Sequence, residues 1–309
     1  MNLLVTGGAG FTGSHFVRAV LGDRLPGLEG ASVTVLDSLR YASTGFDNLD
    51  EVAHAKRLDF VPGDAADAAL VEVLVRRCDA VVHCALGEGA DHVVATATLL
   101  QAAQRRGIDR FVHMSADSVF GSWPEDAATE VSPMSPSSVS AAGVAGADLL
   151  ATAFHRTHGL PVVVARASTT YGSHQHPTGT LPQAVTGLLD GRTVPLHPGR
   201  VRDWLHVDDL GRAIALTLTT GRPGETYHVG GSIELSERAL LALIAEEMGI
   251  DPGPLIPADD EPGDLRYALD DTKIREELGW QPQVEFTTGL AATIRWYRDN
   301  PAWWRPLLP

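Results

Sequence analysis

The feature that most constrains this chain is a run of glycines that directly follows an apolar, strand-like segment. Gly7, Gly10 and Gly13 have the spacing G-x-x-G-x-x-G, with an expected strand over 3–6 before them and an expected helix over about 12–22 after them. Glycine permits a tight turn and close approach of a pyrophosphate, and the helix N-terminus attracts the anion through free N–H groups and its dipole. The context therefore favours a dinucleotide site over the alternative of a plain tight turn.

The ends of the next strands supply further candidate contacts for a dinucleotide. Asp37 ends the second expected strand, where an acidic side chain accepts hydrogen bonds from both adenosine ribose hydroxyls and repels a 2′-phosphate. This favours NAD over NADP, although Arg40 lies nearby. Asp64 follows the third strand, where it would contact the adenine or cap a helix. The candidate cofactor-binding residues are Gly7, Gly10, Phe11, Thr12, Gly13, Asp37, Ser38, Asp64, Ala65, Cys84, Ala85 and Ser168.

Strand-like and helix-like segments alternate through the first half of the chain. The strand-like runs are rich in apolar and β-branched residues and lie at 3–6, 32–36, 59–61, 80–83, 110–114 and 161–165. Helix-like stretches lie between them at about 12–22, 67–77, 92–106 and 140–158. Such alternation is typical of βαβ units, so we expect an α/β fold with a Rossmann-type, doubly wound parallel sheet.

The pattern becomes irregular after residue 166, where proline and glycine are frequent. We expect a smaller, mixed α/β substrate-binding region there. The predicted NAD-binding domain covers 1–166 plus 201–224, and the predicted substrate-binding region covers 167–200 plus 225–309.

Charge and cysteine content exclude several classes of function. The formal net charge is −15 and the pI is about 5.1, which argues against broad binding to nucleic acids or anionic membranes. Cys78 and Cys84 are too few for a disulfide framework or a metal site, and we expect reduced thiols in a cytoplasmic protein. The N-terminus is interpreted as a first strand, not a signal peptide.

Ordered motifs extend along almost the whole chain, at 7–13, 171–172, 201–209, 224–231 and 266–280. Together they resemble the extended short-chain dehydrogenase/reductases, within the NAD-dependent epimerase/dehydratase family, and are most like the dTDP-glucose 4,6-dehydratases. The resemblance implies NAD as the cofactor and a nucleotide sugar as the small-molecule partner. It also implies a homodimer formed through two long helices, one of them matching the Ala- and Gly-rich stretch 141–153.

The same resemblance implies a tyrosine and a lysine, four residues apart, on the helix after the fifth strand. The tyrosinate takes a proton from a sugar hydroxyl, and the lysine and the cofactor's charge lower the pKa of that tyrosine. Here Val139 and Gly143 occupy these positions, and Ser118 replaces the glutamate of the family's Thr-Asp-Glu triplet. Ser115 and Asp117 remain as candidate catalytic residues. We therefore predict an active site in which the standard catalytic residues are degraded.

The candidate substrate contacts are Thr170, Tyr171, Arg202 and Arg266. The two arginines would grip a diphosphate by forked hydrogen bonds, or each would form a salt bridge with a nearby acid. Tyr171 lies in the region expected to contact the substrate, and the alternative is that its aromatic side chain is packed in the core. His174 and His176 are the best replacement bases near neutral pH, although histidines in such a loop are more often plain surface residues.

Three functions remain open on this basis. The first is a catalytically inactive homologue that acts as a partner or regulatory subunit. The second is an enzyme of lyase or isomerase type that uses non-standard residues on a nucleotide sugar or related metabolite. The third is a plain binding module. The fold alone does not decide among them. The glycine loop and Asp37 favour continued use of NAD, whereas the missing tyrosine and lysine argue against ordinary dehydratase turnover.

Overall fold

The structure is a computed structural model that describes residues 1–308 except 41–45, 86, 88, 124–125, 193, 195–196, 198 and 252–265. The strands are β1 (Asn2–Thr6), β2 (Ser32–Asp37), β3 (Leu58–Pro62), β4 (Ala80–His83), β5 (Arg110–Ala116), β6 (Val162–Ala167), β7 (Thr169–Tyr171), β8 (Val201–His206), β9 (Thr226–Val229), β10 (Ile233–Ser236) and β11 (Arg266–Tyr267). The α-helices are α1 (Phe11–Leu21), α2 (Ala68–Val75), α3 (Ala90–Arg106), α4 (Val139–His158), α5 (Thr180–Leu189), α6 (Val207–Thr219), α7 (Glu237–Met248), α8 (Thr272–Leu278), α9 (Phe286–Asp299) and α10 (Pro301–Trp304). Short 3-10 helices include η1 (Asp47–Val52), η2 (Asp117–Phe120) and η4 (Arg305–Leu307).

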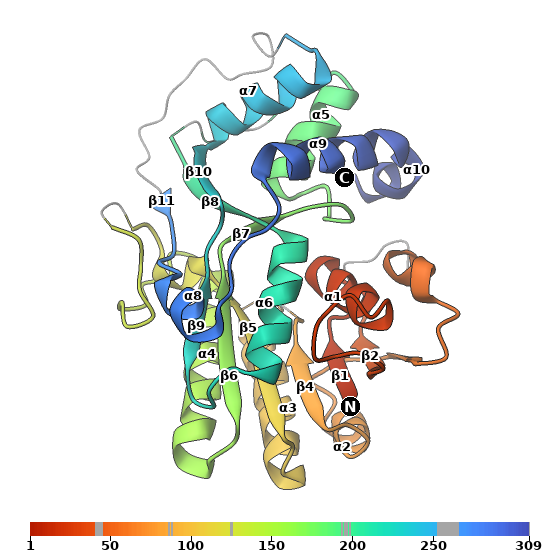
Figure 1. Ribbon diagram of the computed structural model, residues 1–309, viewed down its shortest axis with the longest axis vertical. Helices are drawn as coiled ribbons and strands as arrows, with labels where there is room; N and C mark the ends of the chain where they lie inside the picture. The colour runs from red at the N-terminus through yellow and green to blue at the C-terminus, as the bar shows by residue number, and fades with distance from the viewer. Residues whose placement is uncertain are drawn as a thin grey trace.

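A parallel sheet occupies the centre of the molecule (Figure 1). In the described part of the chain it has seven strands in the order β3-β2-β1-β4-β5-β6-β9. The order reverses at β1, which pairs with β2 on one side and β4 on the other. This is the switch point of a doubly wound fold, so the predicted Rossmann-type α/β architecture is confirmed.

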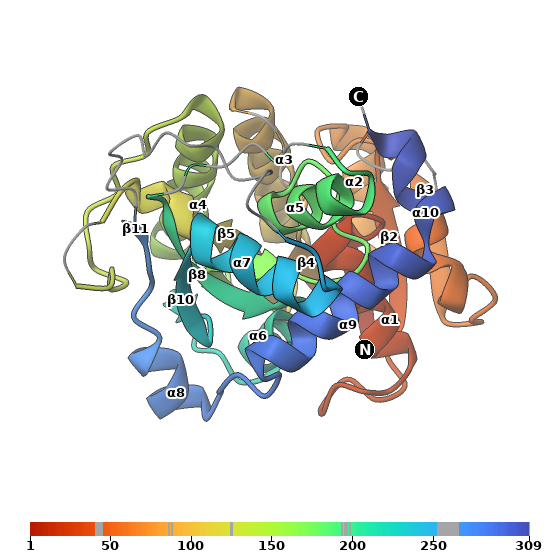
Figure 2. The ribbon, with the colours of Figure 1, turned by 90° about the horizontal axis from the view of Figure 1, so that it is seen from above.

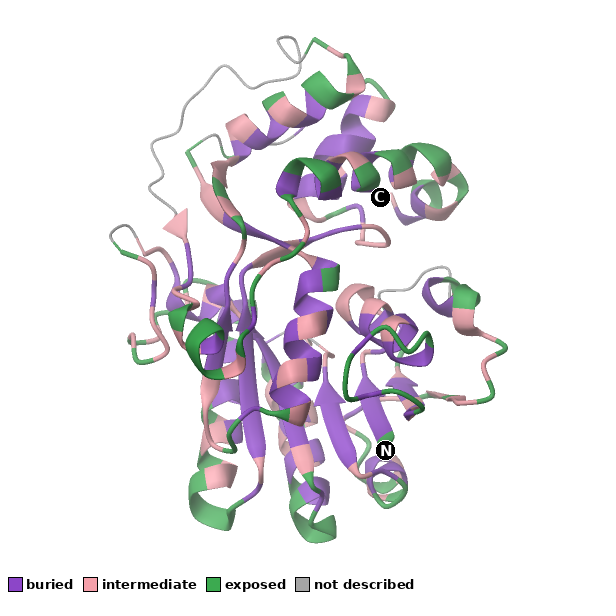
Figure 3. Cartoon of the chain, in the orientation of Figure 1, coloured by how far each residue is buried: buried purple, intermediate pink, exposed green. Residues whose placement is uncertain are grey.

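Helices cover both faces of this sheet (Figures 1 and 2). On one face, α1 and α6 bury residues such as Phe16 and Ile214 against the strands. On the other face, α2, α3 and α4 bury residues such as Leu74 and Leu99. The central strands β1, β4 and β6 are buried along almost their whole length (Figure 3), which is why their sequences are mainly apolar runs.

A smaller second region lies above the carboxyl ends of the central strands (Figures 1 and 2). Its sheet contains β10-β8-β11, with β7 also pairing with β8, and it mixes parallel and antiparallel pairs. Helices α5, α7 and α9 share a core with it that includes Val185, Ile244 and Ile294. The expected smaller mixed α/β region is therefore present.

The division of the chain between the two sheets differs from the expected boundaries. β8 lies in the second sheet, although 201–224 was expected to return to the first domain. β9 lies at the edge of the first sheet, although 225–309 was expected to leave it. The physical reason is that α6 packs on the central sheet and so works as a crossover helix, which delivers β9 parallel to β6.

Local sequence signals set the ends of α4. The Ser138 hydroxyl accepts a hydrogen bond from the Ala141 N–H at 3.1 Å, and Gly159 ends the helix in the left-handed conformation with φ of 67°. None of the described helices, the 20-residue α4 included, combines the length and apolar character needed to cross a membrane.

Candidate cofactor and substrate site

A cavity of about 900 Å³ opens at the carboxyl ends of β1, β2 and β4, where the strand order reverses. Its volume lies within the range of small-molecule and cofactor sites. The structure brings together all the candidate cofactor residues except Ser168. Those that line the cavity are Gly7, Gly10, Phe11, Thr12, Gly13, Asp37, Ser38, Asp64, Ala65, Cys84 and Ala85.

The glycine loop is packed so closely that side chains do not fit. A Cβ on Gly7, which has φ of 70°, would lie 2.6 Å from the Ala85 Cα, and one on Gly13 would lie 2.1 Å from the Gly7 carbonyl oxygen. The loop therefore brings β1, β4 and the start of α1 into contact. The N–H groups of the first turn of α1 have no partners within the helix, so they remain available to an anion in the cavity.

Asp37 is held in place by the backbone around it. Its carboxylate accepts hydrogen bonds from the Ala9 N–H at 2.9 Å and the Leu39 N–H at 2.8 Å. A carboxylate fixed at the end of β2 and facing the cavity is suited to accept hydrogen bonds from ribose hydroxyls.

Asp64 lies in the cavity wall and is not the cap of α2. That cap is Asp67, whose carboxylate accepts hydrogen bonds from the Ala69 and Leu70 N–H groups. Asp64 instead accepts from the Ala66 N–H at 2.9 Å and pairs with Arg40 at 2.8 Å. Arg40, the residue that weakened the sequence-based preference for NAD over NADP, is therefore paired with a carboxylate.

Residues 173–179, called the roof segment here, form a wall of the cavity, of which the sequence analysis proposed only His174 and His176. The cavity is lined by its His174, Gln175, His176, Thr178 and Gly179, together with Trp303 and Leu307 from the C-terminal end of the chain. Ring centroids are 4.3 Å apart for His174 and Trp296, and 4.9 Å apart for Trp296 and Trp303. Both loop histidines thus lie at the site, but burial lowers the pKa of His174 to about 3, which makes it a poor base.

Ser115 lies beneath α4 and not in the cavity, so the prediction that it is catalytic is corrected. Its hydroxyl donates to the Asp148 carboxylate at 2.8 Å, and Arg166 Nε donates to the same carboxylate at 2.7 Å. Asp148 is 0% exposed. Alternate side chains of a strand point to opposite faces, and residue 115 of β5 points toward the helix.

Asp117 is the first residue of η2, after β5 has ended, and lies in a buried acidic group beside the second sheet. Burial raises its pKa to about 6, against the opposing effect of Arg202. Burial likewise raises the pKa of Asp203 to about 6, although Asp203 accepts hydrogen bonds from Ser168 Oγ at 2.6 Å and the Gly231 N–H at 2.7 Å. Ser168 therefore serves this second group and lies outside the lining of the cofactor cavity.

Both candidate phosphate-binding arginines are paired with glutamates. Arg202 Nε lies 3.4 Å from Glu237 Oε1, and Arg266 donates to Glu234 from Nε and from a terminal nitrogen, each at 2.7 Å. Glu237 is only 2% exposed and also lies 3.6 Å from Arg200. Sequence analysis missed Glu237. A diphosphate at this place would compete with its buried carboxylate.

Thr170 and Tyr171 make internal contacts. The Thr170 hydroxyl donates to the Ser168 carbonyl at 3.0 Å. Tyr171 is 0% exposed, and burial raises the pKa of its phenol above the ordinary value. Tyr171 therefore belongs to the core of the second region, and its prediction as a substrate contact is corrected.

Comparison with known proteins identifies the family. The family model described as GDP-mannose 4,6 dehydratase matches residues 4–293. A dTDP-glucose 4,6-dehydratase of Streptomyces niveus is 47% identical over 322 residues, covering 99% of this chain and 96% of that one. The chain belongs to the nucleotide-sugar epimerase/dehydratase family.

Solved structures of dTDP-glucose 4,6-dehydratases agree with this assignment. DesIV of Streptomyces venezuelae, with NAD bound, is 46% identical with a TM-score of 0.95, and all of both chains is covered. The enzyme of Bacillus anthracis, in complex with NAD, is 34% identical with a TM-score of 0.92, again over all of both chains.

Helix α4 contributes one of the described residues that line the cavity. The residue that lines the cavity is Ser140, whereas Val139 is 80% exposed and points elsewhere. Gly143 packs on α3, because a Cβ there would lie 2.3 Å from the Gly89 carbonyl oxygen. The residue four places after Ser140 is Val144, which is 5% exposed. Neither Val139 nor Gly143, the positions expected for the family's tyrosine and lysine, is among the described residues that line the cavity.

Proposed function

We propose that this chain is an NAD-binding, nucleotide-sugar-modifying member of the epimerase/dehydratase family in which the standard dehydratase chemistry is impaired. The single observation behind this proposal is that α4 offers the cavity Ser140 and no tyrosine or lysine. The whole chain has only two lysines, Lys56 and Lys273, and Lys273 is bound to Glu225 at 2.6 Å. No lysine therefore lies on α4 to lower the pKa of a neighbouring base.

The residues of the cavity fit NAD. The close-packed glycine loop and the first turn of α1 would hold the pyrophosphate, and Asp37 would hold the adenosine ribose. NAD would supply a hydride acceptor. The relatives from S. venezuelae and B. anthracis, both solved with NAD, support the same choice.

Ser140 limits what the chain can do to a sugar hydroxyl. A serine hydroxyl donates and accepts hydrogen bonds, but it does not act as a base near neutral pH without an adjacent base of its own. Hydride transfer from a sugar carbon requires a group that takes the hydroxyl proton. We therefore infer that oxidation of a bound sugar is slow or absent.

A nucleotide-sugar-like small molecule is the proposed partner of the second region, as the names of the relatives suggest. Arg202 and Arg266 would bind the diphosphate of such a ligand, but each is paired with a glutamate. We infer weaker binding of a diphosphate than free arginines would give.

Loss of the standard residues is compatible with a role as an inactive partner or regulatory subunit. A second candidate function is an enzyme of lyase or isomerase type with a non-standard active site, favoured by Asp117. A carboxyl group with a pKa of about 6 exchanges protons readily near neutral pH.

A homodimer in the cytoplasm is part of the proposal. The thiols of Cys78 and Cys84 are free, as in proteins of a reducing compartment. Helices α3 and α4 run side by side, and the exposed apolar side chains on α4 include Val139 at 80% and Leu149 at 63%. Light scattering should give the mass of two chains, and Leu149→Glu should give one. A wild-type monomer would contradict the dimer.

The test of the proposed function combines calorimetry with a turnover assay. NAD should bind in titration calorimetry, whereas mixing the protein with NAD and dTDP-glucose should give no NADH absorbance and no 4-keto sugar. The S. niveus relative serves as the positive control. Turnover close to that of the relative would overturn the impairment, and failure to bind NAD would overturn the cofactor assignment.

A further inference from the structure

Arg40 and Asp64 form an ion pair in the wall of the cofactor cavity. Arg40 lies just beyond the end of β2, and Asp64 lies just beyond the end of the neighbouring strand β3. A terminal nitrogen of Arg40 lies 2.8 Å from Asp64 Oδ2, and both residues line the cavity. Their side chains are 64% and 42% exposed, so a ligand in the cavity can reach both. The pair is therefore part of the site and not of the core.

The pairing of β2 with β3 explains how these two residues meet. Asp37 and Pro62 stand opposite each other at the ends of the two parallel strands, and the Gly63 N–H donates to the Asp37 carbonyl at 2.9 Å. Beyond β2 the chain turns at Leu39, which has φ of 56° and donates its N–H to the Asp37 carboxylate at 2.8 Å. The arginine that follows this turn lies beside the end of β3 as a result.

The two carboxylates at this end of the cavity have different partners. Both oxygens of Asp37 accept hydrogen bonds from backbone N–H groups, those of Ala9 and Leu39. Asp64 uses Oδ1 to accept the Ala66 N–H at 2.9 Å and Oδ2 to accept from the guanidinium. Asp64 is thus the carboxylate that engages the arginine, while Asp37 faces the position expected for the adenosine ribose.

Arg40 is the only arginine or lysine among the described residues that line the cavity. The histidines of that lining, His174 and His176, do not replace it, because burial lowers the pKa of each and keeps both rings neutral near pH 7. NADP differs from NAD by a 2′-phosphate on the adenosine ribose, which an arginine at this place accommodates. A guanidinium suits a phosphate because its fork donates two parallel hydrogen bonds. The cation that would bind this phosphate is therefore already occupied.

We propose that Asp64 is a specificity-determining residue, which holds Arg40 away from a 2′-phosphate and so favours NAD over NADP. This inference rests on the proposed binding of NAD. It adds an indirect effect to the direct repulsion of the phosphate by Asp37. One carboxylate repels the 2′-phosphate at the ribose, and the other occupies the side chain that would bind it. Exposed ion pairs are weak, so removal of the charge on Asp64 is enough to release the arginine.

Titration calorimetry of the full chain with NADP and with NAD tests the inference. Asp64→Asn keeps an oxygen for the Ala66 N–H but loses the charge. NADP affinity should therefore rise about fivefold, the scale of one exposed ion pair, while NAD affinity changes by less than about twofold. The same ratio should appear when both chains also carry Asp37→Asn, which removes the direct repulsion. The matched control is Asp59→Asn, which removes an exposed carboxylate of β3 outside the described lining of the cavity and should leave both affinities unchanged.

A double-mutant cycle separates the release of Arg40 from the simple loss of a negative charge. Arg40→Gln should lower NADP affinity more in the Asp64→Asn chain than in the wild type, because only there is the guanidinium free to bind the 2′-phosphate. An equal gain from Asp64→Asn with and without the arginine overturns the inference, since Asp64 would then act by its charge alone. NAD binding without any gain for NADP overturns this inference alone. If neither dinucleotide binds, the cofactor assignment is overturned together with it.

Discussion

At the scale of single residues, the charged side chains of the site differ in whether other protein groups already bind them. Asp37 is fixed by two backbone N–H groups and still faces the cavity. Arg202 and Arg266, in contrast, are engaged by glutamates. The cofactor half is therefore organised to receive a ligand, whereas the substrate half must first give up contacts that it already has.

Replacement of Asp37 by asparagine should weaken NAD binding by about 10–100-fold, because hydrogen bonds to a charged group contribute roughly 1.5–3 kcal/mol. The same change should narrow the preference for NAD over NADP, since the repulsion of a 2′-phosphate is removed. Titration calorimetry with both dinucleotides measures these effects. Asp59→Asn, at an exposed position of β3, is the control. Equal affinities for wild type and Asp37→Asn would contradict the assignment.

Glu237→Gln should strengthen binding of thymidine diphosphate about tenfold, because Arg200 and Arg202 lose the carboxylate that now competes for them. Glu246→Gln, at an exposed position of the same helix, should leave the affinity unchanged. Thermal unfolding of both variants would separate a change of affinity from a change of stability. A weaker affinity in Glu237→Gln would show that the carboxylate helps to position the arginines for the ligand.

At the scale of elements, the contact between α4 and the start of α3 decides which side chains face the cavity. Gly143 meets Gly89 backbone to backbone, and this contact sets the rotation of α4 about its axis. Ser140 faces the cavity as a result, and Val139 faces solvent.

Gly143→Ala should therefore destabilise the protein by about 1–3 kcal/mol, because its Cβ would lie 2.3 Å from a backbone oxygen that cannot move alone. Gly146→Ala on the same helix is the matched control. Its Cβ would meet only the end of the Val93 side chain at 3.2 Å, and alanine favours a helix by roughly 1 kcal/mol over glycine. Urea unfolding of both variants measures the difference. Equal stabilities would show that the two helices separate easily.

At the scale of the whole molecule, buried acids make stability depend on pH. Asp117 has a folded-state pKa of about 6, whereas an unfolded aspartate has a pKa of about 3.9. A raised folded-state pKa means that Asp117 costs little stability below about pH 4, that its cost grows between about pH 4 and 6, and that the cost is constant at higher pH.

Asp117→Asn should accordingly be more stable than the wild type by about 1–3 kcal/mol at pH 8, with a smaller difference at pH 5. Urea unfolding at the two pH values measures this. Asp109→Asn, at an exposed position, should show no such trend. If the stability difference between Asp117→Asn and the wild type were larger at pH 5 than at pH 8, the carboxylate would be stabilised in the folded state.

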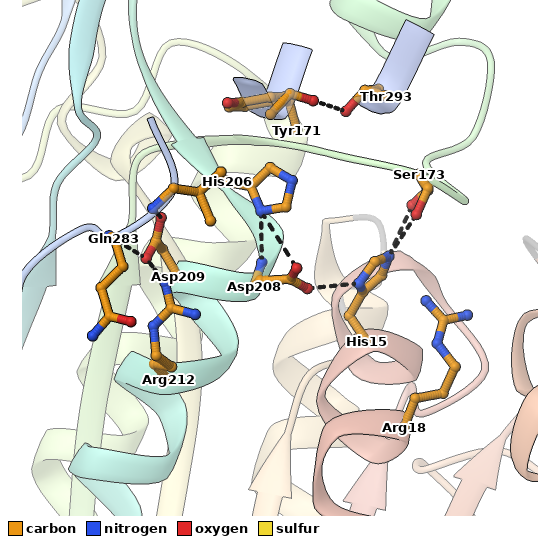
Figure 4. Close-up of polar contacts among 12 residues, drawn as sticks. His15, Arg18, Tyr171, Ser173, His206, Asp208, Asp209, Arg212, Gln283 and Thr293 are labelled. Carbon is orange, nitrogen blue, oxygen red and sulfur yellow. Dashed lines mark hydrogen bonds and ion pairs between the residues drawn. The ribbon is translucent and has the colours of Figure 1, made fainter. Parts of the chain in front are cut away.

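The fold and the cofactor half were predictable because their signals are local. A glycine loop, the strand that precedes it and the acid at the next strand end lie close together in sequence. The roof segment was not predictable in this way, since His15 of α1 meets Ser173 and Asp208 (Figure 4), which are distant along the chain. The rotation of α4 could not be predicted from its own residues either. A contact with another helix sets it.

The path of the chain between its two sheets has a consequence for biosynthesis. The edge strand β9 joins the first sheet only after the chain has passed through β8 of the second, and the core beneath α1 and α6 also includes Ile274 and Trp280. During synthesis, the first sheet and its core thus cannot be completed until residue 280 has left the ribosome. Fragments cut after β6 would expose an apolar strand edge, which β9 covers in the folded chain.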